Sequence, residues 1–508
     1  MPERDRRSEV FLDVEAGARP ASSPARDRRP VPDEPFRMAV LGDFSGRANR
    51  GERRSAEELR SIGSIRVDRD SIDAAIARLR PRLRIPTAAP ELPTLEVEFR
   101  CMDDFHPDTL YAGLPLLEEL RELRHLAEDP SRFPGEPGSG AEPEAPLPPA
   151  GPGAGSDPRP GGGGLLDQIL TEQGPDPVDP GAAGDLHAFI QRVAAPHTVA
   201  ATSARQAEVL QRIDAAASDQ LLELLRHRHF RGLESLWRAV QLLAARLETG
   251  ESLQIHLVDV TRDEMEDELE RAARGGGSGL HRLLAAPAAT PGDVPWALLV
   301  GCYAFRPGQG ALLARIAAVG REAGAPFVSR AAPELVGAAS FEGTPDPREW
   351  QATEDPAWEA LRRSDLAPWV ALAAPRFLLR LPYGADSDPP DTVALEEAEM
   401  PPRHGDFLWG NPAVFCALLL ARSFTRAGWG MRPELTLEED RLPLHIAEGP
   451  DGAVAQPCAE ALMTDRAASR LLDLGIIPLA SFRDQDRVRV ARFQSIADPV
   501  AGLRGRWA

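Results

Sequence analysis

The sequence contains no lysine, so arginine supplies all 58 of its basic residues. This absence excludes several kinds of chemistry. A Walker-type phosphate loop needs a lysine, and so do Schiff-base catalysis and the nucleotide contact of protein kinases. The formal net charge is −20. That charge argues against nucleic acid or an anionic membrane surface as a partner, because both need a positive face on the protein.

Cysteine is scarce as well. The four cysteines lie far apart and none forms a Cys-x-x-Cys pair; they are Cys101, Cys302, Cys416 and Cys458. This spacing predicts buried thiols in a reducing compartment and not a disulfide framework. No apolar run reaches the ~20 residues of a transmembrane helix. The N-terminal MPERDRRSEV also lacks the apolar stretch of a signal peptide. We therefore expect a cytoplasmic protein.

Glycine (43 residues) and proline (49 residues) are abundant for a chain that is 43% hydrophobic. They are most concentrated at 130–164, a composition that cannot bury a core and predicts a disordered linker. Residues 1–34, rich in Arg, Asp, Pro and Ser, predict a disordered N-terminal arm. Two domains are expected on either side of the linker: residues 35–129, called the small segment below, and residues 165–508, called the large segment.

In the small segment the apolar spacing predicts strands at Phe36–Leu41, around Ile65 and Val67, and at Leu95–Phe99. It also predicts two helices. One is capped by Asp70 and has Ile72, Ile76 and Leu79 on its apolar face. The other is amphipathic, runs over 110–126 and follows Pro107, a residue suited to the first turn of a helix.

Strand and helix patterns alternate in the large segment, which predicts an α/β fold with a mixed sheet and flanking amphipathic helices. The expected helices are Leu165–Thr171, Leu186–Val193, Ala201–Leu247, Thr261–Arg274, Ala311–Val319, Pro412–Arg426 and Asp465–Leu474. The expected strands are Leu253–Leu257, Trp296–Val300, Pro326–Val328, Trp369–Leu372 and Leu442–Ile446.

Some residues of the small segment stand where an α/β enzyme could place its chemistry. Asp43 directly follows the first expected strand, and Asp103 and Asp104 are an adjacent pair before an expected helix. Ser45 lies outside any Gly-x-Ser-x-Gly motif. Asp43 is a single carboxylate without a partner histidine or metal-ligand cluster, which is weak evidence for catalysis. The local patterns favour a turn at Asp43 and a helix cap at the aspartate pair.

Other candidate residues are equally isolated. Cys302 follows an expected strand and reads as a small buried side chain. His227 and His229 alternate with arginine, which favours capping of helix carbonyls over metal ligation. The glycine runs at 161–164 and 275–279 lack the surroundings of phosphate or dinucleotide loops. We therefore predict that the protein is not an enzyme and has no catalytic, cofactor-binding or metal site.

Several stretches resemble one system. In the small segment, FRMAVLGDFSGR (36–47), VDRDSIDAAIARLRPRL (67–83) and MDDFHPDTLYAGLPLLEELRELR (102–124) resemble the small subunit of the type VI secretion contractile sheath. The large segment resembles the large sheath subunit. The most specific stretch is PRFLLRLPYG (375–384) followed by FLWGNPA, and other resembling stretches are 230–243, 296–305, 324–330, 407–429 and 464–479.

The resemblance implies a non-enzymatic, fused sheath protomer that polymerises around an inner tube and contracts to propel it. The partners it implies are other sheath protomers, the inner-tube protein, baseplate components and a recycling unfoldase. Two departures stand out. Cys302 replaces an aspartate usual in the family, and the chain ends at Ala508 without the family's C-terminal portion. A non-polymerising adaptor or assembly factor is therefore the alternative, ahead of an α/β enzyme.

Overall fold

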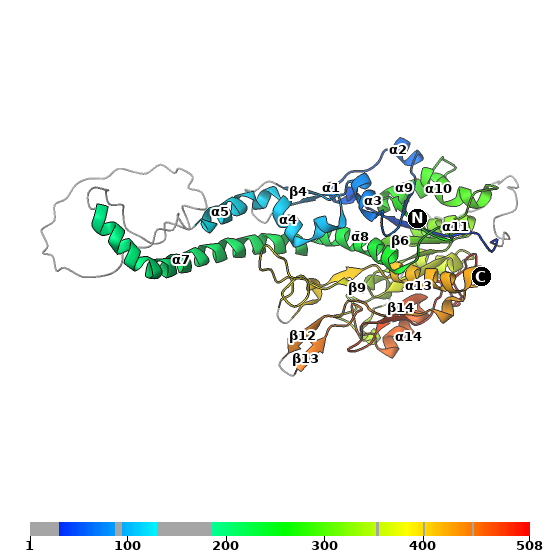
Figure 1. Ribbon diagram of the computed structural model, residues 1–508. Helices are drawn as coiled ribbons and strands as arrows, with labels where there is room; N and C mark the ends of the chain where they lie inside the picture. Colours follow the sequence, from blue (N-terminus) through cyan, green and yellow to red (C-terminus); the bar gives the residue numbers. More distant parts are fainter. Residues whose placement is uncertain are drawn as a thin grey trace, which may run out of the picture. The chain divides into compact units, whose positions relative to one another are not determined.

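The structure is a computed structural model that describes residues 30–86, 94–129, 184–351, 355–399, 402–449 and 452–507 (Figure 1). The chain divides into two compact units. One comprises the chain up to Leu117 together with Ala217 onward, and the other comprises Glu118–Ala216. The expected linker at 130–164 and the expected helix at 165–171 lie outside the described residues.

The first unit is built on a nine-stranded sheet of order β11-β15-β14-β8-β7-β6-β1-β5-β2. Neighbours from β14 through to β5 run parallel, whereas β2, β15 and β11 pair antiparallel at the two ends. The predicted α/β fold with a mixed sheet is therefore confirmed. The strands are β1 (Phe36–Gly42), β2 (Ile65–Val67), β5 (Leu253–Asp259), β6 (Leu298–Phe305), β7 (Phe327–Ala331), β8 (Val370–Ala374), β11 (Glu438–Glu439), β14 (Ile476–Ser481) and β15 (Val488–Val490).

Three smaller antiparallel pairs accompany this sheet. They are β3 (Arg82–Ile85) with β4 (Leu95–Glu98), β9 (Phe377–Arg380) with β10 (Leu408–Gly410), and β12 (Ile446–Gly449) with β13 (Gly452–Ala455). The α-helices are α1 (Arg47–Arg50), α2 (Ala56–Arg60), α3 (Ile72–Leu79), α4 (Pro107–Gly113), α5 (Glu118–Glu128), α7 (Gly184–Arg226), α8 (Arg228–Arg246), α9 (Arg262–Ala273), α10 (Gly279–Ala289), α11 (Gly310–Ala323), α12 (Pro356–Arg362), α13 (Pro412–Ala427) and α14 (Asp465–Asp473).

Alternate side chains of β1 pack against the helices on one face of the sheet. Ala39 and Leu41 belong to one core cluster with Leu269 of α9, Leu284 of α10 and Ile316 of α11. Side chains two residues apart point to the same face of a strand, so this face of β1 packs under those three helices. Helix α13 packs against β6, β7 and β8. Its side chains are buried almost throughout, which explains its nearly uninterrupted apolar sequence.

Two expected helices are each divided in the structure. The helix expected over 110–126 is α4 followed by a 3-10 turn at Pro115–Leu117 and then by α5. Pro115 has no amide hydrogen to donate, so it ends one helix and opens the next turn. The helix expected over Ala201–Leu247 is interrupted at His227. That residue has extended backbone (φ −67°, ψ 129°), which separates α7 from α8.

Other expectations about local structure were also wrong. Ser71 and not Asp70 precedes α3, and it makes no side-chain capping bond. The strand expected at Leu442–Ile446 begins only at Ile446, where the β12–β13 hairpin opens. Helix α10 was not expected at all, because its first residues look like the end of a glycine loop and Pro287 lies inside it. Pro287 cannot donate to the Leu283 carbonyl four residues earlier, and the Trp296 indole N–H donates to that carbonyl instead, at 3.0 Å.

Candidate functional site: the seam between the segments

The central feature of the first unit is the position of β1. This strand comes from the small segment, but its neighbours on both sides, β5 and β6, come from the large segment. We call the contacts between residues 30–117 and 217–507 the seam. Its backbone bonds include the Phe36 amide donating to the Ser252 carbonyl (2.8 Å) and the Val260 amide donating to the Gly42 carbonyl (2.9 Å). The two segments therefore share one sheet.

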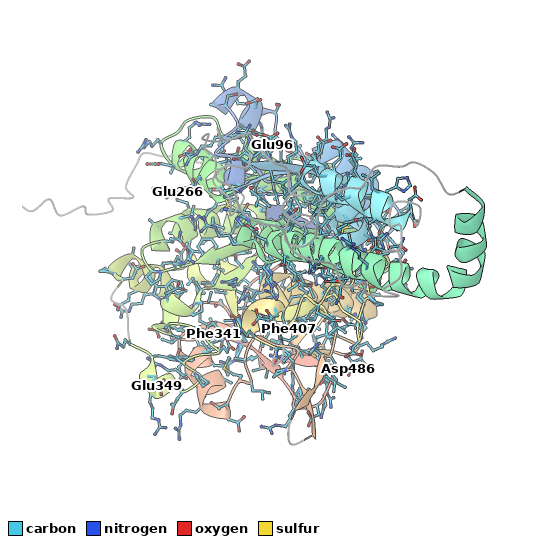
Figure 2. The ribbon with its side chains drawn as sticks, turned by 90° about the vertical axis from the view of Figure 1, so that its left-hand side faces the viewer. Glu96, Glu266, Phe341, Glu349, Phe407 and Asp486 are labelled. Atoms are coloured by element: carbon cyan, nitrogen blue, oxygen red, sulfur yellow. The ribbon has the colours of Figure 1, made fainter. Side chains whose placement is uncertain are left out.

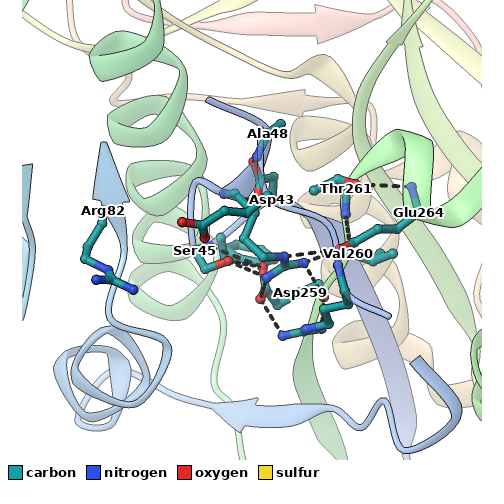
Figure 3. Close-up of polar contacts among 12 residues, drawn as sticks. Asp43, Ser45, Ala48, Arg82, Asp259, Val260, Thr261 and Glu264 are labelled. Atoms are coloured by element: carbon teal, nitrogen blue, oxygen red, sulfur yellow. Dashed lines mark hydrogen bonds and ion pairs between the residues drawn. The ribbon is translucent and has the colours of Figure 1, made fainter. Parts of the chain in front are cut away.

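A cluster of buried charges lies at the carboxyl end of β1 (Figure 3). The Arg47 guanidinium pairs with Asp259 at the end of β5 and with Glu264 on α9, at 2.8 Å for the second pair. All three side chains are less than a tenth exposed. Arg54 adds a second cation, 2.9 Å from Asp259. Ser45 completes the cluster, because its amide donates to Asp259 at 3.1 Å.

The geometry of this cluster is set by local caps. Thr261 and Glu264 form a capping box at the start of α9, so each side chain accepts a bond from the other's amide. Burial alone would raise the pKa of Glu264, but hydrogen bonds from Arg47 and from the Arg54 and Thr261 amides hold it below the ordinary value. On the same helix Glu266 points outward (Figure 2). Helix α9 therefore places only some of its acidic side chains in the seam.

Aromatic packing extends the seam away from these charges. Trp237 of α8 packs edge-on against Phe44, with ring centroids 5.2 Å apart, and its indole N–H donates to the Phe44 carbonyl. Further along, Phe99 and Phe105 stack at 4.2 Å, and both rings lie 5.9 Å from Phe230 of α8. Aromatic pairs of this kind stabilise by about 0.5–1.5 kcal/mol beyond their buried area. Helix α8 is thus held by the small segment at two places.

The two ends of the described chain also meet in the seam. Trp507 lies over Phe36 with ring centroids 6.3 Å apart, and Trp429 packs against the same ring at 5.9 Å. Arg506 forms an ion pair of 2.6 Å with Glu34, and both side chains are less than a tenth exposed. These contacts fasten the start of β1 to residues near the end of the large segment.

A second buried charge network lies within the large segment. Arg380 of β9 binds Glu234 of α8 (2.6 Å) and Glu397 (2.6 Å) through its guanidinium, and both carboxylates are fully buried. The cation also lies 4.1 Å above the ring of Tyr383, whose hydroxyl accepts a bond from Arg238. A buried cation between two carboxylates requires this full set of partners. The network holds the stretch PRFLLRLPYG against α8.

The structure places the predicted candidates in structural roles. Asp43 accepts bonds from the amides of Arg47 and Ala48, both at 2.9 Å, as expected for a turn. Burial, followed by the nearby Asp259, raises its pKa. Cys302 is a largely buried thiol whose burial raises its pKa to about 12, so the reactive thiolate is suppressed at neutral pH.

The capping predictions were partly wrong. Asp104 accepts from the Cys101 amide and caps a 3-10 turn, whereas His106 precedes α4 and accepts from its second amide. His227 stands before α8 and makes no side-chain capping bond, and among the described residues its Nδ1 has no hydrogen-bond partner. Its ring lies 5.4 Å from that of His229. Within the described ranges, no three His, Cys, Asp or Glu side chains are placed to hold a metal ion.

Sequence reasoning missed the buried ion pairs. Arg47 falls in the stretch LGDFSGR and Arg380 in PRFLLRLPYG, but an arginine in sequence looks the same whether it is buried or solvated. The helices in the described part of the chain are all too short or too polar to cross a bilayer.

Comparison with known proteins agrees with a chain built from two segments that share one sheet. Residues 207–497 match the VipB family, described as the EvpB/VC_A0108 tail sheath N-terminal domain. The chain belongs to the tail-sheath family. Residues 26–129 match the VipA family, described as type VI secretion system, VipA, VC_A0107 or Hcp2. The sheath chain is therefore a fusion of small-subunit and large-subunit sequences, which confirms the resemblance found in the sequence.

A curated relative adds to this result. Over 305 residues the sheath chain is 30% identical to the type VI secretion system sheath protein TssC1 of Pseudomonas aeruginosa strain PAO1. The match covers 58% of the sheath chain and 61% of TssC1. The sheath chain thus spans less than two thirds of the length of this relative.

Proposed function

We propose that the fused chain is one structural protomer of a type VI secretion-like contractile sheath. In this role it polymerises around an inner tube in the cytoplasm, and contraction of the polymer propels the tube. It performs no catalysis. Its partners are further sheath protomers, the inner-tube protein, the baseplate and an unfoldase that recycles the contracted state. The divisions at residues 34, 129 and 164 separate an arm, the small-subunit part, a linker and the large-subunit part.

The observation that supports this proposal most directly is β1 in the interior of the sheet. A strand with large-segment neighbours on both sides cannot leave without opening the sheet, so residues 30–117 and 217–507 form one mechanical body. Covalent joining also fixes their ratio at one to one, and it replaces association of two chains by an intramolecular event of roughly millimolar effective concentration.

The buried charges of the seam fit the same role. Contractile assemblies change shape mainly by rigid-body movement of their subunits, while interfaces between subunits repack. Such a subunit must resist internal shear. The Arg47 cluster joins the two segments by buried ion pairs, and the Arg380 network does the same for elements within the large segment. Breaking either set would leave buried charges without partners.

Electron microscopy tests the proposal. The full chain is expressed with and without its inner-tube protein, and the particles are imaged and sized by sedimentation. We expect tubes that occur in an extended and a shorter, wider form when the inner tube is present. Discrete small particles under both conditions would contradict the proposal and favour the adaptor or assembly-factor alternative.

A further inference from the structure

A cavity of about 480 Å³ lies where α8 begins and where β6 and β7 end. Its lining is strongly basic although the whole chain carries a charge of −20. No aspartate or glutamate belongs to the lining among the described residues. The basic lining residues are Arg226, Arg228, Arg231, Arg330, Arg376 and His404.

Three of these arginines are held in place by carboxylates behind the cavity wall. Arg376 pairs with Glu460 at 2.6 Å. Arg226 lies 3.3 Å from Glu399, and Arg231 lies 3.4 Å from Glu397. Anchored guanidinium groups keep their orientation, so little conformational entropy is lost when a ligand contacts their remaining N–H groups.

Arg330 is different. In the described part of the chain it has neither a carboxylate within ion-pair distance nor a hydrogen-bond acceptor, although its side chain is largely enclosed. Burial, followed by the nearby Arg376, lowers its pKa to about 10, so it stays charged at neutral pH. A poorly solvated cation without a counter-ion is costly, and an anion in the cavity would offset that cost. Arg228, exposed at the first position of α8, also has no such partner in the same ranges.

Two helix starts add to the positive potential. Helix α8 begins at Arg228, and α13 begins directly after Asn411, which also lines the cavity. The amide ends of helices favour anions. Guanidinium groups match the oxygens of a phosphate in paired, charge-assisted bonds. The volume falls in the ordinary range for small-molecule sites, about 300–1,000 Å³.

From this convergence we propose that the cavity binds a small phosphate-bearing anion, between pyrophosphate and a nucleoside triphosphate in size, with Arg330 and Arg228 as its direct contacts. This site borders the seam, because Leu236 and Cys302 of its lining also lie beside Gly42, but all its lining residues belong to the large segment. The proposal does not depend on the sheath role. Its volume and enclosed arginines favour a compact, multiply charged ligand over an extended acidic peptide.

Calorimetric titration of the full chain with pyrophosphate and with ATP, in metal-free buffer, tests the proposal. We expect binding that weakens at least about tenfold in Arg330→Gln, because the substitution removes a charge-assisted contact to the anion. Arg228→Gln, exposed and independent of the core, should weaken binding as well. If circular dichroism shows that Arg330→Gln does not fold, the result for Arg228→Gln decides the test.

Arg466→Gln is the matched control. It removes the same charge from an exposed position on α14, outside the cavity, and should leave both affinities unchanged. Absence of binding by both anions overturns the proposal, and so does an equal loss in all three variants, which would indicate general charge screening. Binding of a polyglutamate peptide through Arg330, without binding of either phosphate compound, would assign the site to a protein carboxylate instead and likewise overturn it.

Discussion

Replacing Arg47 by glutamine tests whether the buried charges hold the seam together. The substitution keeps a polar but shorter side chain and removes one charge. After the substitution, Arg54 is the remaining ion-pair partner of Asp259, and Glu264 has lost the cation that paired with it. Removing one partner of a buried pair costs about 3–5 kcal/mol. Since Arg54 still neutralises part of the cluster, we expect a loss near the lower end, about 3 kcal/mol.

Urea unfolding followed by tryptophan fluorescence measures this loss, because Trp237 packs directly against Phe44 in the seam. Arg53→Gln is the control. Arg53 pairs with Asp263 and Asp267 on the same helix α9, but all three side chains are about half exposed. Exposed pairs contribute less than about 1 kcal/mol. If Arg47→Gln lowers stability no more than Arg53→Gln does, the reasoning about buried charges is refuted.

The pH dependence gives an independent check. Glu264 has a folded-state pKa below its ordinary value of 4.5. Its pairing therefore stabilises the fold fully above that ordinary value, and the stabilisation is lost as the pH falls through the lower, folded-state pKa. The variant lacks the pair at every pH. The difference in unfolding free energy between wild type and Arg47→Gln should consequently shrink as the pH is lowered from 7 toward 3.

Three more outcomes are expected. A protease site inserted within 130–183 and cut should leave the two pieces co-purifying, because β1 stays inside the sheet; separation of the pieces in native buffer would contradict the seam. Gly301→Ala should destabilise by about 1–3 kcal/mol in urea unfolding, since the new Cβ would lie 2.2 Å from Phe327, whereas Gly113→Ala meets open space and should cost little. The Cys416 thiol, whose burial raises its pKa to about 12, should resist alkylation at pH 8 until the protein is unfolded.

Strands were the best predicted elements. The apolar runs at Phe36–Leu41 and Trp296–Val300 predicted strands, and the structure places β1 and β6 side by side in the interior of the sheet. A strand buried on both faces has a continuous apolar sequence, and the short length of these runs distinguishes them from a buried helix. The order of the strands could not be predicted in this way, because it depends on pairing across more than 200 residues.

Local breaks and buried charges were predicted poorly, for different reasons. No proline or glycine lies within four residues of His227, so the residue types there give no sign of the extended residue that separates α7 from α8. Arg47 meets Asp259 and Glu264 only after the chain has folded. Hydrophobic patterns in a sequence indicate which residues are buried, but they do not indicate which charged side chains form ion pairs in the folded protein.

The interior position of β1 has a consequence during synthesis. Its pairing residues begin with Leu253, more than 200 residues after Phe36. At translation rates of about 5–20 residues per second, the finished strand must wait on the order of 10–40 s for its first neighbour. Throughout that time an apolar strand with two unpaired edges is exposed to other nascent chains, a known route to aggregation. Ribosome-associated chaperones should therefore bind this protein early, near the apolar stretch that begins at Phe36, and release it only when β5 and β6 have been made.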